Sequence, residues 1–449
     1  MAGLMMVYKT NPKRNLTLQA ALDDAMQKFI ADNPLSKKRH NRARQVLPGG
    51  NTRSVLHYDP FPLVMQRGSG VDLWDIDGHH YVDFLGEYTA GLFGHSHPAI
   101  TKSVKQALDD GIVLCAPNQY EAELAAILCE KFPSCDLIRF CNSGTEANMF
   151  ALNAARSFTG KSEIMVFDGA YHGGVLYFAH GNSPINAPYT TVMGRYNDLD
   201  HTLPLIEQHA ETLAAILVEP MMGAAGAIPG DPEFLQGLRK AASEHEVVLI
   251  FDEVMTSRLS TGGLQLKLGI IPDMTTFGKY IGGGLTVGAF GGREDIMRQF
   301  DPNLPDALPH AGTFNNNVLT MAAGVTSLKN VYTPEVAEQH NRNGEKFRQR
   351  LNTVIRQTGV AAQVTGVGSI MCIHFQDGPI RTPADTVEAH QDARALLHLT
   401  MLRSGYYLAA RGFISLSLPL TDKHYDGFVG AFQEFLETSS AVLQIAFET

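Results

Sequence analysis

Short, continuous apolar segments alternate with segments of helical spacing from about residue 120 to residue 290. Such segments predict strands that are covered on both faces, because a strand with one face in water alternates apolar and polar residues. Strands that alternate with helices are typical of an α/β fold, in which helices cover a mostly parallel central sheet. The expected strands lie at residues 137–140, 164–167, 214–218, 247–251 and 287–290.

Polar side chains follow four of these strands, just after each strand ends. They are Asn142, Asp168, Glu219 and Asp252. Right-handed crossovers place the carboxyl ends of parallel strands along one edge of a sheet, so we expect these side chains to meet in one crevice. The sequence therefore predicts a functional site at this edge.

The first hundred residues predict elements outside that sheet. Apolar residues at helical spacing between Leu22 and Ile30 predict a helix with one apolar face, which needs a partner surface. Asp77-Gly78, between two strand-like segments, predicts a hairpin. Pro98 begins a further helical pattern.

The pattern changes again after about residue 325. A helix, short strands at residues 369–375 and 413–418, and a final helix predict an α+β unit. We expect the two ends of the chain to form this small domain together. The expected divisions are residues 1–85 for the N-terminal segment, 86–325 for the large domain and 326–449 for the C-terminal part.

Composition excludes several classes of partner. The chain has 449 residues, of which 44% are hydrophobic and 18% charged, enough to bury a large core. Its formal net charge of −10 comes without a basic stripe, so we expect small-molecule partners and neither nucleic acid nor a membrane surface. No apolar run approaches the roughly 20 residues of a spanning helix, and residues 1–15 lack the apolar core of a signal peptide.

The cysteines and histidines predict neither disulfides nor metal. Five cysteines, an odd number without close pairs, argue against a disulfide framework or a zinc site and favour a reducing, cytoplasmic location. His95 and His97 resemble a metal pair but lack a third ligand, so cap and packing roles are favoured.

Lys279 is the first candidate for chemistry. It stands between an apolar strand end and a glycine run at residues 282–284, which lacks the spacing of a dinucleotide-binding loop. An ammonium kept from water by Phe277 and Ile281 favours its neutral form, and a neutral amine can attack an aldehyde to form a Schiff base. A solvated loop lysine is the alternative. Asp252, 27 residues upstream at a strand end, favours chemistry, because pyridoxal phosphate requires such a lysine and a buried aspartate.

Asp252 is the second anchor. An aspartate keeps a pyridine nitrogen protonated, and at about 4 Å with an effective dielectric near 20 the attraction is on the order of 4 kcal/mol before desolvation. Val254 projects to the same side and can pack on the ring, while Glu219 has a similar place near the phenolic oxygen. Capping of the next turn is the alternative, although a carboxylate that ends an apolar strand is costly without a partner.

Two further segments suit a flat, phosphorylated cofactor. Ser143-Gly144-Thr145 follows a strand and opens a helix, where backbone N–H groups bind phosphate. A capping box from Ser143 to Glu146 explains the same residues equally well. Tyr171 and His172 lie on a glycine-rich loop after the next strand, where an aromatic ring can stack on the cofactor, although an ordinary loop aromatic is the alternative.

The sequence resembles a class III aminotransferase of PLP fold type I, in the branch that includes glutamate-1-semialdehyde aminomutase. The resemblance covers residues 47–418. Its motifs, in family order, are 142–147, 171–173, Glu219-Pro220, 251–254 and Gly278-Lys279. It implies that Lys279 binds the cofactor covalently and moves the proton, that Asp252 holds the pyridine nitrogen, and that the turn at Ser143 cups the phosphate.

The resemblance also implies a homodimer. The segment 310–314 matches one whose threonine, here Thr313, reaches the phosphate bound by the other subunit. Two active sites would then lie at the subunit interface.

Within this family the sequence is most similar to the β-phenylalanine, or aromatic β-amino acid, aminotransferases. The segments 48–55 and 409–413 carry this likeness. Arginines at the places of Arg53 and Arg411 bind substrate carboxylates in that group, and a guanidinium fork suits a carboxylate. A surface ion pair is the alternative for either arginine.

The expected reaction is a two-step, ping-pong transamination from a β-amino acid to a keto acid such as 2-oxoglutarate. Relatives that act on terminal amines have a glutamate shortly after the Glu-Pro pair, whereas residues 221–223 here read Met-Met-Gly, which weakens an ornithine- or GABA-type assignment. Glutamate-1-semialdehyde aminomutase is the second hypothesis. A non-catalytic nucleotide-binding or regulatory protein is the third, because fold alone does not establish function.

Overall fold

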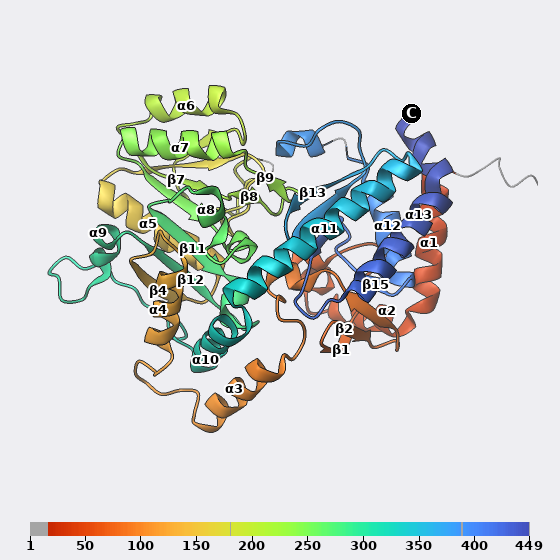
Figure 1. Ribbon diagram of the computed structural model, residues 1–449, viewed down its shortest axis with the longest axis horizontal. Helices are drawn as coiled ribbons and strands as arrows, with labels where there is room; N and C mark the ends of the chain where they lie inside the picture. Colours follow the sequence, from red (N-terminus) through yellow and green to blue (C-terminus); the bar gives the residue numbers. More distant parts are fainter. Residues whose placement is uncertain (1–16, 180, 388, 449) are drawn as a thin grey trace, which may run out of the picture.

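The computed structural model describes residues 17–179, 181–387 and 389–448, in two layered parts that helix α11 (Pro334–Thr358) joins (Figure 1). The expectation about residues 1–15 lies outside this range. None of the described helices is long and apolar enough to span a bilayer.

A seven-stranded sheet forms the centre of the larger part, in the order β4-β12-β11-β10-β7-β5-β6. All its neighbours pair in parallel except β12, which is antiparallel to both β4 and β11. The strands are β4 (Leu137–Cys141), β5 (Glu163–Phe167), β6 (Thr191–Gly194), β7 (Leu213–Val218), β10 (Val248–Asp252), β11 (Met274–Gly278) and β12 (Gly288–Gly292). The prediction of a mostly parallel α/β sheet is confirmed.

Strand β6 was not expected, and β11 was expected only as the apolar strand end before Lys279, without a range of its own. Their sequences mix apolar residues with threonine and glycine, so they lack a continuous apolar run. In β11 the threonines are buried because their hydroxyls have partners: Thr275 Oγ1 lies 2.7 Å from Ser134 Oγ, and Thr276 Oγ1 donates to Asn148 Oδ1 at 2.6 Å. Tertiary hydrogen bonds therefore allow polar residues in a central strand.

Helix α5 (Gly144–Thr159) begins at the edge of the sheet where the candidate site residues lie. It packs against several strands through small buried residues, including Ala147, Ala151 and Ala154, which let the helix approach the sheet closely. Its N-terminus thereby lies at the carboxyl end of β4. The other helices of this part are α3 (Pro98–Asp109), α4 (Glu121–Lys131), α6 (Leu199–Gln208), α7 (Pro232–Glu244), α8 (Gly263–Leu268), α9 (Glu294–Met297) and α10 (Val318–Thr326), and a short ribbon joins β8 (Met221–Met222) to β9 (Ile228–Pro229).

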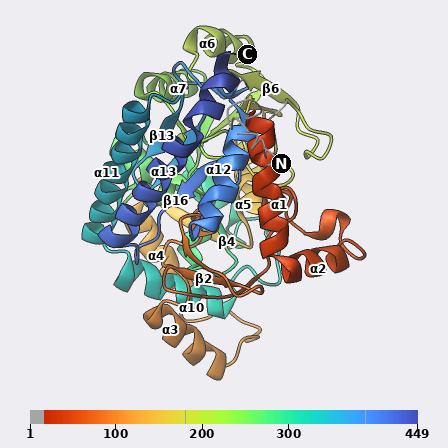
Figure 2. The same ribbon diagram turned by 90° about the vertical axis from the view of Figure 1, so that its right-hand side faces the viewer.

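The smaller part contains both ends of the described chain. One core cluster joins N-terminal residues such as Leu18 and Phe84 to C-terminal residues such as Phe347 and Phe428. Figure 2 shows α1 beside α12 and α13, which it contacts. The two ends therefore share one core, while the exact domain divisions at residues 85 and 325 stay a prediction.

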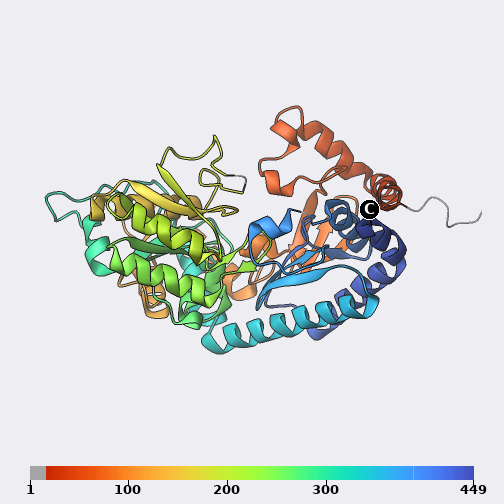
Figure 3. The ribbon, with the colours of Figure 1, turned by 90° about the horizontal axis from the view of Figure 1, so that it is seen from above.

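Two small sheets complete this part. The predicted hairpin at Asp77-Gly78 is confirmed, because β2 and β3 are antiparallel. The predicted helix that begins at Pro98 is also confirmed, as α3 of the larger part. Figure 3 shows α1 and α2, in red, on one side of this part and α11, in cyan, along the opposite side. The elements are α1 (Leu18–Asp32), α2 (Pro34–Ala43), α12 (Gln391–Arg403), α13 (Asp422–Glu448), a sheet of β1 (Met65–Ser69), β2 (Asp72–Asp75), β3 (His80–Asp83) and β15 (Tyr406–Tyr407), and a sheet of β13 (Gln363–Val367), β14 (Ile370–His374) and β16 (Phe413–Ser415).

Candidate active site

The carboxyl ends of the central strands carry the candidate site. Asp252 is the last residue of β10, Glu219 follows β7, and Lys279 follows β11 as the first residue of the short helix η5 (Lys279–Gly282). Asp168, after β5, is exposed and makes no side-chain hydrogen bond among the described residues. The expected site therefore contains the ends of the other strands, without the Asp168 side chain.

The Asp252 carboxylate is buried and accepts hydrogen bonds from three directions. His172 Nδ1 lies 2.8 Å from Oδ2, Asn148 Nδ2 donates to the same oxygen at 2.8 Å, and the Val254 N–H donates to Oδ1 at 3.0 Å. Thr276 orients the Asn148 amide by donating to its oxygen. These hydrogen bonds hold the carboxylate in one orientation. They also offset the free-energy cost of burying a charged group at the end of an apolar strand.

Sequence reasoning missed Asn148 and Thr276. Asn148 lies one helical turn after Gly144, so a face of α5 connects it to the phosphate-binding turn. A buried polar residue at that spacing is the signal that could have found it.

His172 does not lie free on its loop, because it packs against Asp252. Its ring is buried, and Nε2 has no hydrogen-bond partner among the described residues. The next residue, Gly173, has φ +122°, and a Cβ there would lie 2.1 Å from Thr145 Oγ1. Only glycine lets this loop approach the start of α5 so closely.

The turn Ser143-Gly144-Thr145 caps α5 and keeps donors available. Ser143 Oγ accepts from the Glu146 N–H at 3.2 Å, while Glu146 Oε2 accepts from the Asn142 N–H at 2.9 Å. Thr145 Oγ1 accepts from the Gly174 N–H at 3.1 Å. Because both hydroxyl oxygens act as acceptors, their protons stay free to donate to an anion at the positive end of a 16-residue helix. Ser143 therefore caps the helix, but the expected capping box is incomplete, because Glu146 accepts from the Asn142 N–H and not from the Ser143 N–H. This cap is compatible with phosphate binding.

Val254 brings this turn next to Lys279. A Cβ on Gly144 would lie 2.9 Å from Val254 Cγ2. A Cβ on Gly278 would lie 3.4 Å from Val254 Cγ1 and 3.6 Å from the Gly144 nitrogen. The phosphate-binding turn, the apolar side chain and the lysine are thus neighbours, although 135 residues separate Gly144 from Lys279.

Lys279 has the protonation behaviour expected of a reactive amine. Burial lowers its pKa to about 8, against the attraction of Asp252 and Glu219, while Arg411 and Arg53 lower it further. At pH 7 roughly a tenth of such amines is neutral, compared with fewer than one in a thousand for an ordinary lysine. Its backbone φ of +57° is also unusual for a residue with a side chain. Strain of this kind gathers at functional sites.

Glu219 anchors the loop that carries Tyr171. Its carboxylate accepts from the Tyr171 N–H at 3.0 Å and from the Gly223 N–H at 2.9 Å. Burial raises the pKa of Glu219 to about 7, opposed by nearby His172 and supported by Asp252. Tyr171 is 42% exposed, and its ring and the Tyr177 ring form an edge-to-face pair with 5.8 Å between their centroids.

The two candidate substrate arginines share one aromatic ring. Arg53 Cζ lies 5.9 Å and Arg411 Cζ 5.1 Å from the centroid of Tyr88. Arg411 also donates to the Ala224 carbonyl at 3.3 Å, whereas Arg53 forms an ion pair with Glu87. Sequence reasoning missed Glu87 and Tyr88, since nothing in the local sequence indicates which arginines they contact.

Thr313 lies on an exposed segment, and its side chain makes no hydrogen bond with the other described residues. Two residues later, Asn315 Oδ1 accepts from Asn142 Nδ2 at 2.9 Å, which ties the segment to the exit of β4. Its role across a subunit interface stays a prediction.

The residues present fit pyridoxal phosphate. The buried Asp252 carboxylate lies next to His172, whose Nε2 has no partner among the described residues. Gly144 and Gly173 let neighbouring segments come close to the N-terminus of α5. The amine of Lys279 has a lowered pKa at the same place. This donor set suits an aldehyde that carries both a phosphate and a basic ring nitrogen.

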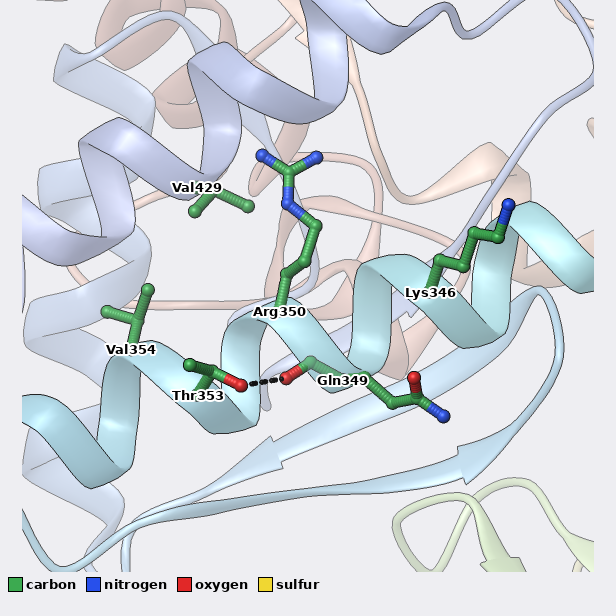
Figure 4. Close-up of a pocket in the computed structure, with 6 residues that line it drawn as sticks. All are labelled: Lys346, Gln349, Arg350, Thr353, Val354 and Val429. Atoms are coloured by element: carbon green, nitrogen blue, oxygen red, sulfur yellow. Dashed lines mark hydrogen bonds between the residues drawn. The ribbon is translucent and has the colours of Figure 1, made fainter.

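Two other places in the described part of the chain were candidates for a site: the histidines His95 and His97, and a surface groove. His95 Nε2 contacts Asp83 Oδ2 at 3.1 Å, and the described residues contain no group of three or more potential metal ligands. A groove of about 560 Å³ lies between α11 and α13 (Figure 4). Its lining consists of Lys346, Gln349, Arg350, Thr353, Val354 and Val429. It opens on the surface and holds neither a nucleophile nor a buried titratable pair.

Known proteins resemble this chain along nearly all its length. The pattern of the family described as Aminotransferase class-III matches residues 54–398. A beta-phenylalanine transaminase of Variovorax paradoxus is 49% identical over 426 residues, 95% of this chain and 98% of that protein. A solved β-phenylalanine aminotransferase from the same organism superposes with a TM-score of 0.94 at 48% identity, covering 95% of this chain and 99% of the other. A glutamate-1-semialdehyde 2,1-aminomutase of Desulforudis audaxviator is 35% identical, covering 90% of this chain and 98% of that protein.

Proposed function

The chain belongs to the class III aminotransferases, and we propose that it transfers the amino group of a β-amino acid, β-phenylalanine or a similar aromatic one, to a keto acid such as 2-oxoglutarate. Its fold is PLP fold type I, and it is a transaminase that depends on pyridoxal phosphate. The observation that carries the substrate proposal is the pair of arginines on Tyr88, whose charges act on Lys279 and lower its pKa. The 49% identity to a beta-phenylalanine transaminase supports the same substrate class.

In this proposal, the described side chains hold the cofactor at both ends. The N–H groups and hydroxyls of Ser143-Gly144-Thr145 would bind the phosphate, and Asp252, positioned by His172, would keep the ring nitrogen protonated. Tyr171 and Val254 would pack against the ring. When bound, pyridoxal phosphate withdraws electrons from the substrate carbon that bears the amino group.

Lys279 moves the proton. Its neutral Nζ would accept the proton from the amino-bearing carbon, and the ammonium that results would donate this proton to the C4′ carbon of the cofactor. A pKa of about 8 suits both directions, because the neutral and charged forms differ little in free energy near neutral pH.

The arginines select for carboxylates. A guanidinium binds a carboxylate through two parallel hydrogen bonds, and a dicarboxylate acceptor can engage both Arg53 and Arg411. An aromatic donor has only one carboxylate, so its ring must lie elsewhere in the pocket, away from one of the two arginines. The same pocket thus serves both half-reactions.

A donor and acceptor screen tests this proposal. The purified holoenzyme should convert β-phenylalanine only when 2-oxoglutarate or pyruvate is present, with kcat/KM at least roughly tenfold above that for ornithine or GABA. Chromatography of the keto and amino products measures this. Conversion of glutamate-1-semialdehyde without any acceptor would instead identify an aminomutase, and no conversion of any donor would favour the non-catalytic hypothesis.

We also propose a homodimer, located in the cytoplasm. The segment 108–114 exposes four large apolar side chains, Leu108, Ile112, Val113 and Leu114, and Phe314 is 62% exposed. Asn118 Nδ2 donates to the Asn316 carbonyl at 2.7 Å, so these segments form one surface. Exposed apolar patches of this kind mark protein interfaces, and Thr313 borders this one. All five cysteines are free, which suits a reducing compartment.

The mass in solution tests the dimer. Light scattering should give about twice the chain mass of 49.0 kDa. Phe314→Asp should shift the population toward monomer and lower the affinity for the cofactor, because a buried charge opposes association. Val387→Asp, at an apolar residue that is also exposed but lies in another region, is the control and should leave the mass unchanged. A monomeric wild-type protein with full activity would contradict the proposal.

A further inference from the structure

Three consecutive residues beside the arginines have a left-handed backbone. Glu87, Tyr88 and Thr89 have φ values of +47°, +51° and +82°, within the short helix η3 (Gly86–Thr89). Residues with side chains rarely adopt this conformation singly, and a run of three is less common still. Such strain persists only where the surroundings impose it, and it gathers at functional sites.

Buried contacts on both sides fix this turn. Asp83 Oδ1 accepts from the Leu85 N–H at 2.8 Å and from the Gly86 N–H at 3.0 Å. A Cβ on Gly86 would lie 2.6 Å from the Ser415 carbonyl oxygen, so β16 is in direct contact. At the other end, the fully buried Arg258 donates to the Thr89 carbonyl at 3.3 Å. The turn is therefore a rigid part of the site.

The turn presents Tyr88 to both arginine-bearing segments. The Tyr88 hydroxyl donates to the Val55 carbonyl at 3.1 Å, two residues after Arg53. Its ring stacks on Phe413, with 5.8 Å between centroids and 25° between planes, and Arg411 contacts both rings. Tyr88 thus sets the relative positions of the two guanidinium groups.

Glu87 pairs with only one of these arginines. The Arg53–Glu87 ion pair is open to water, with 46% and 56% of the two side chains exposed. Arg411 has no carboxylate partner among the described residues. An exposed pair exchanges partners at little cost, so another carboxylate can replace Glu87 on Arg53.

We propose that Glu87 is an internal counter-ion of Arg53, held in place by the strained turn, which competes with the carboxylates of substrates and products. This inference rests on the proposed function, because it needs substrates that carry carboxylates. Each turnover of a ping-pong transaminase admits and releases two such molecules. Glu87 keeps Arg53 paired between these events and so limits how tightly each product is held.

Removal of the charge of Glu87 tests the competition. For the holoenzyme, Glu87→Gln should lower the calorimetric Kd of the unreactive carboxylates 3-phenylpropanoate and glutarate about two- to fivefold. Glu87→Gly is a second charge-free variant that the left-handed backbone favours, so it should fold and bind in the same way. Glu87→Asp keeps the charge and should restore the wild-type Kd.

Two controls separate competition from a structural role. Glu338→Gln removes a similar exposed pair, Glu338–Arg342 on α11, and should change neither Kd. Binding of 1-phenylethylamine, which lacks a carboxylate, should not tighten in Glu87→Gln. Unchanged or weaker carboxylate binding in both charge-free variants would overturn the proposal.

The outcomes also distinguish this inference from the proposed function. If the wild type does not convert β-phenylalanine but Glu87→Gln binds carboxylates more tightly, the substrate assignment fails and the role of Glu87 stands. If the wild type converts β-phenylalanine and the charge-free variants bind no more tightly, the role of Glu87 fails and the function stands.

Discussion

Lys279→Ala is expected to abolish transamination and leave the protein folded. The change removes the covalent attachment of the cofactor and the group that moves the proton, so the rate should fall by a factor on the order of 10⁴ or more. Folding should survive, because the substitution also removes a partly desolvated amine whose pKa is about 8 and keeps a residue with a Cβ at the same φ. Turnover of β-phenylalanine with 2-oxoglutarate measures the loss, and the thermal midpoint checks the fold.

The covalent role has its own readout. Borohydride should fix pyridoxal phosphate to the peptide that contains Lys279 in the wild type, and mass spectrometry should find no such product in Lys279→Ala. Lys329→Ala, which removes an exposed lysine paired with Glu123, is the matched control and should retain full activity. Unchanged transamination by Lys279→Ala would refute the assignment of this residue.

Sequence patterns were sufficient for the parts of the fold that local interactions determine. Continuous apolar runs identified five strands of the central sheet, and a polar residue at a strand end identified Asp252. The range of β11 was not predicted, because Thr275 and Thr276 interrupt its apolar run. Both are buried because their hydroxyls form hydrogen bonds with residues of other elements. No pattern within a short segment contains that information.

The site likewise has residues that local sequence identifies and residues that only tertiary contacts bring together. Lys279, Asp252 and the turn at Ser143 lie in short motifs whose chemistry is evident from residue type and neighbours. The Tyr88 ring lies 35 residues from Arg53 and more than 300 from Arg411, so its contacts with both depend on the packing of the small part against the sheet. Substrate recognition is therefore the least local property of the site.

Asp252→Asn should lower the rate about 10²- to 10³-fold while the cofactor stays bound. The carboxylate's attraction for a protonated ring nitrogen is on the order of 4 kcal/mol, and each 1.4 kcal/mol corresponds to a factor of ten, so the loss approaches but does not exceed 10³. The phosphate contacts at Ser143 are untouched, so retention of the cofactor is expected. Steady-state kinetics and the amount of bound cofactor measure both effects.

The substitution should also destabilise the fold slightly, for a separate reason. An asparagine has one amide oxygen, so its nitrogen must replace either Oδ2, which accepts from Asn148 and His172, or Oδ1, which accepts from the Val254 N–H. Asn148 Nδ2 keeps its bond to the His172 carbonyl, but one buried hydrogen bond to residue 252 is lost in either orientation. One unsatisfied buried donor costs about 1–3 kcal/mol, which a fall in the thermal midpoint of the cofactor-free protein would report.

Asp252→Glu separates charge from hydrogen bonding, because it keeps the carboxylate while disturbing the geometry. It should destabilise the cofactor-free protein at least as much as Asp252→Asn, yet retain more activity, since the ring nitrogen still faces a negative charge. Asp72→Asn, at an exposed aspartate paired with His80, should change neither property. If Asp252→Glu were no more active than Asp252→Asn, then Asp252 would serve the fold through Asn148 and His172 rather than the chemistry through its charge.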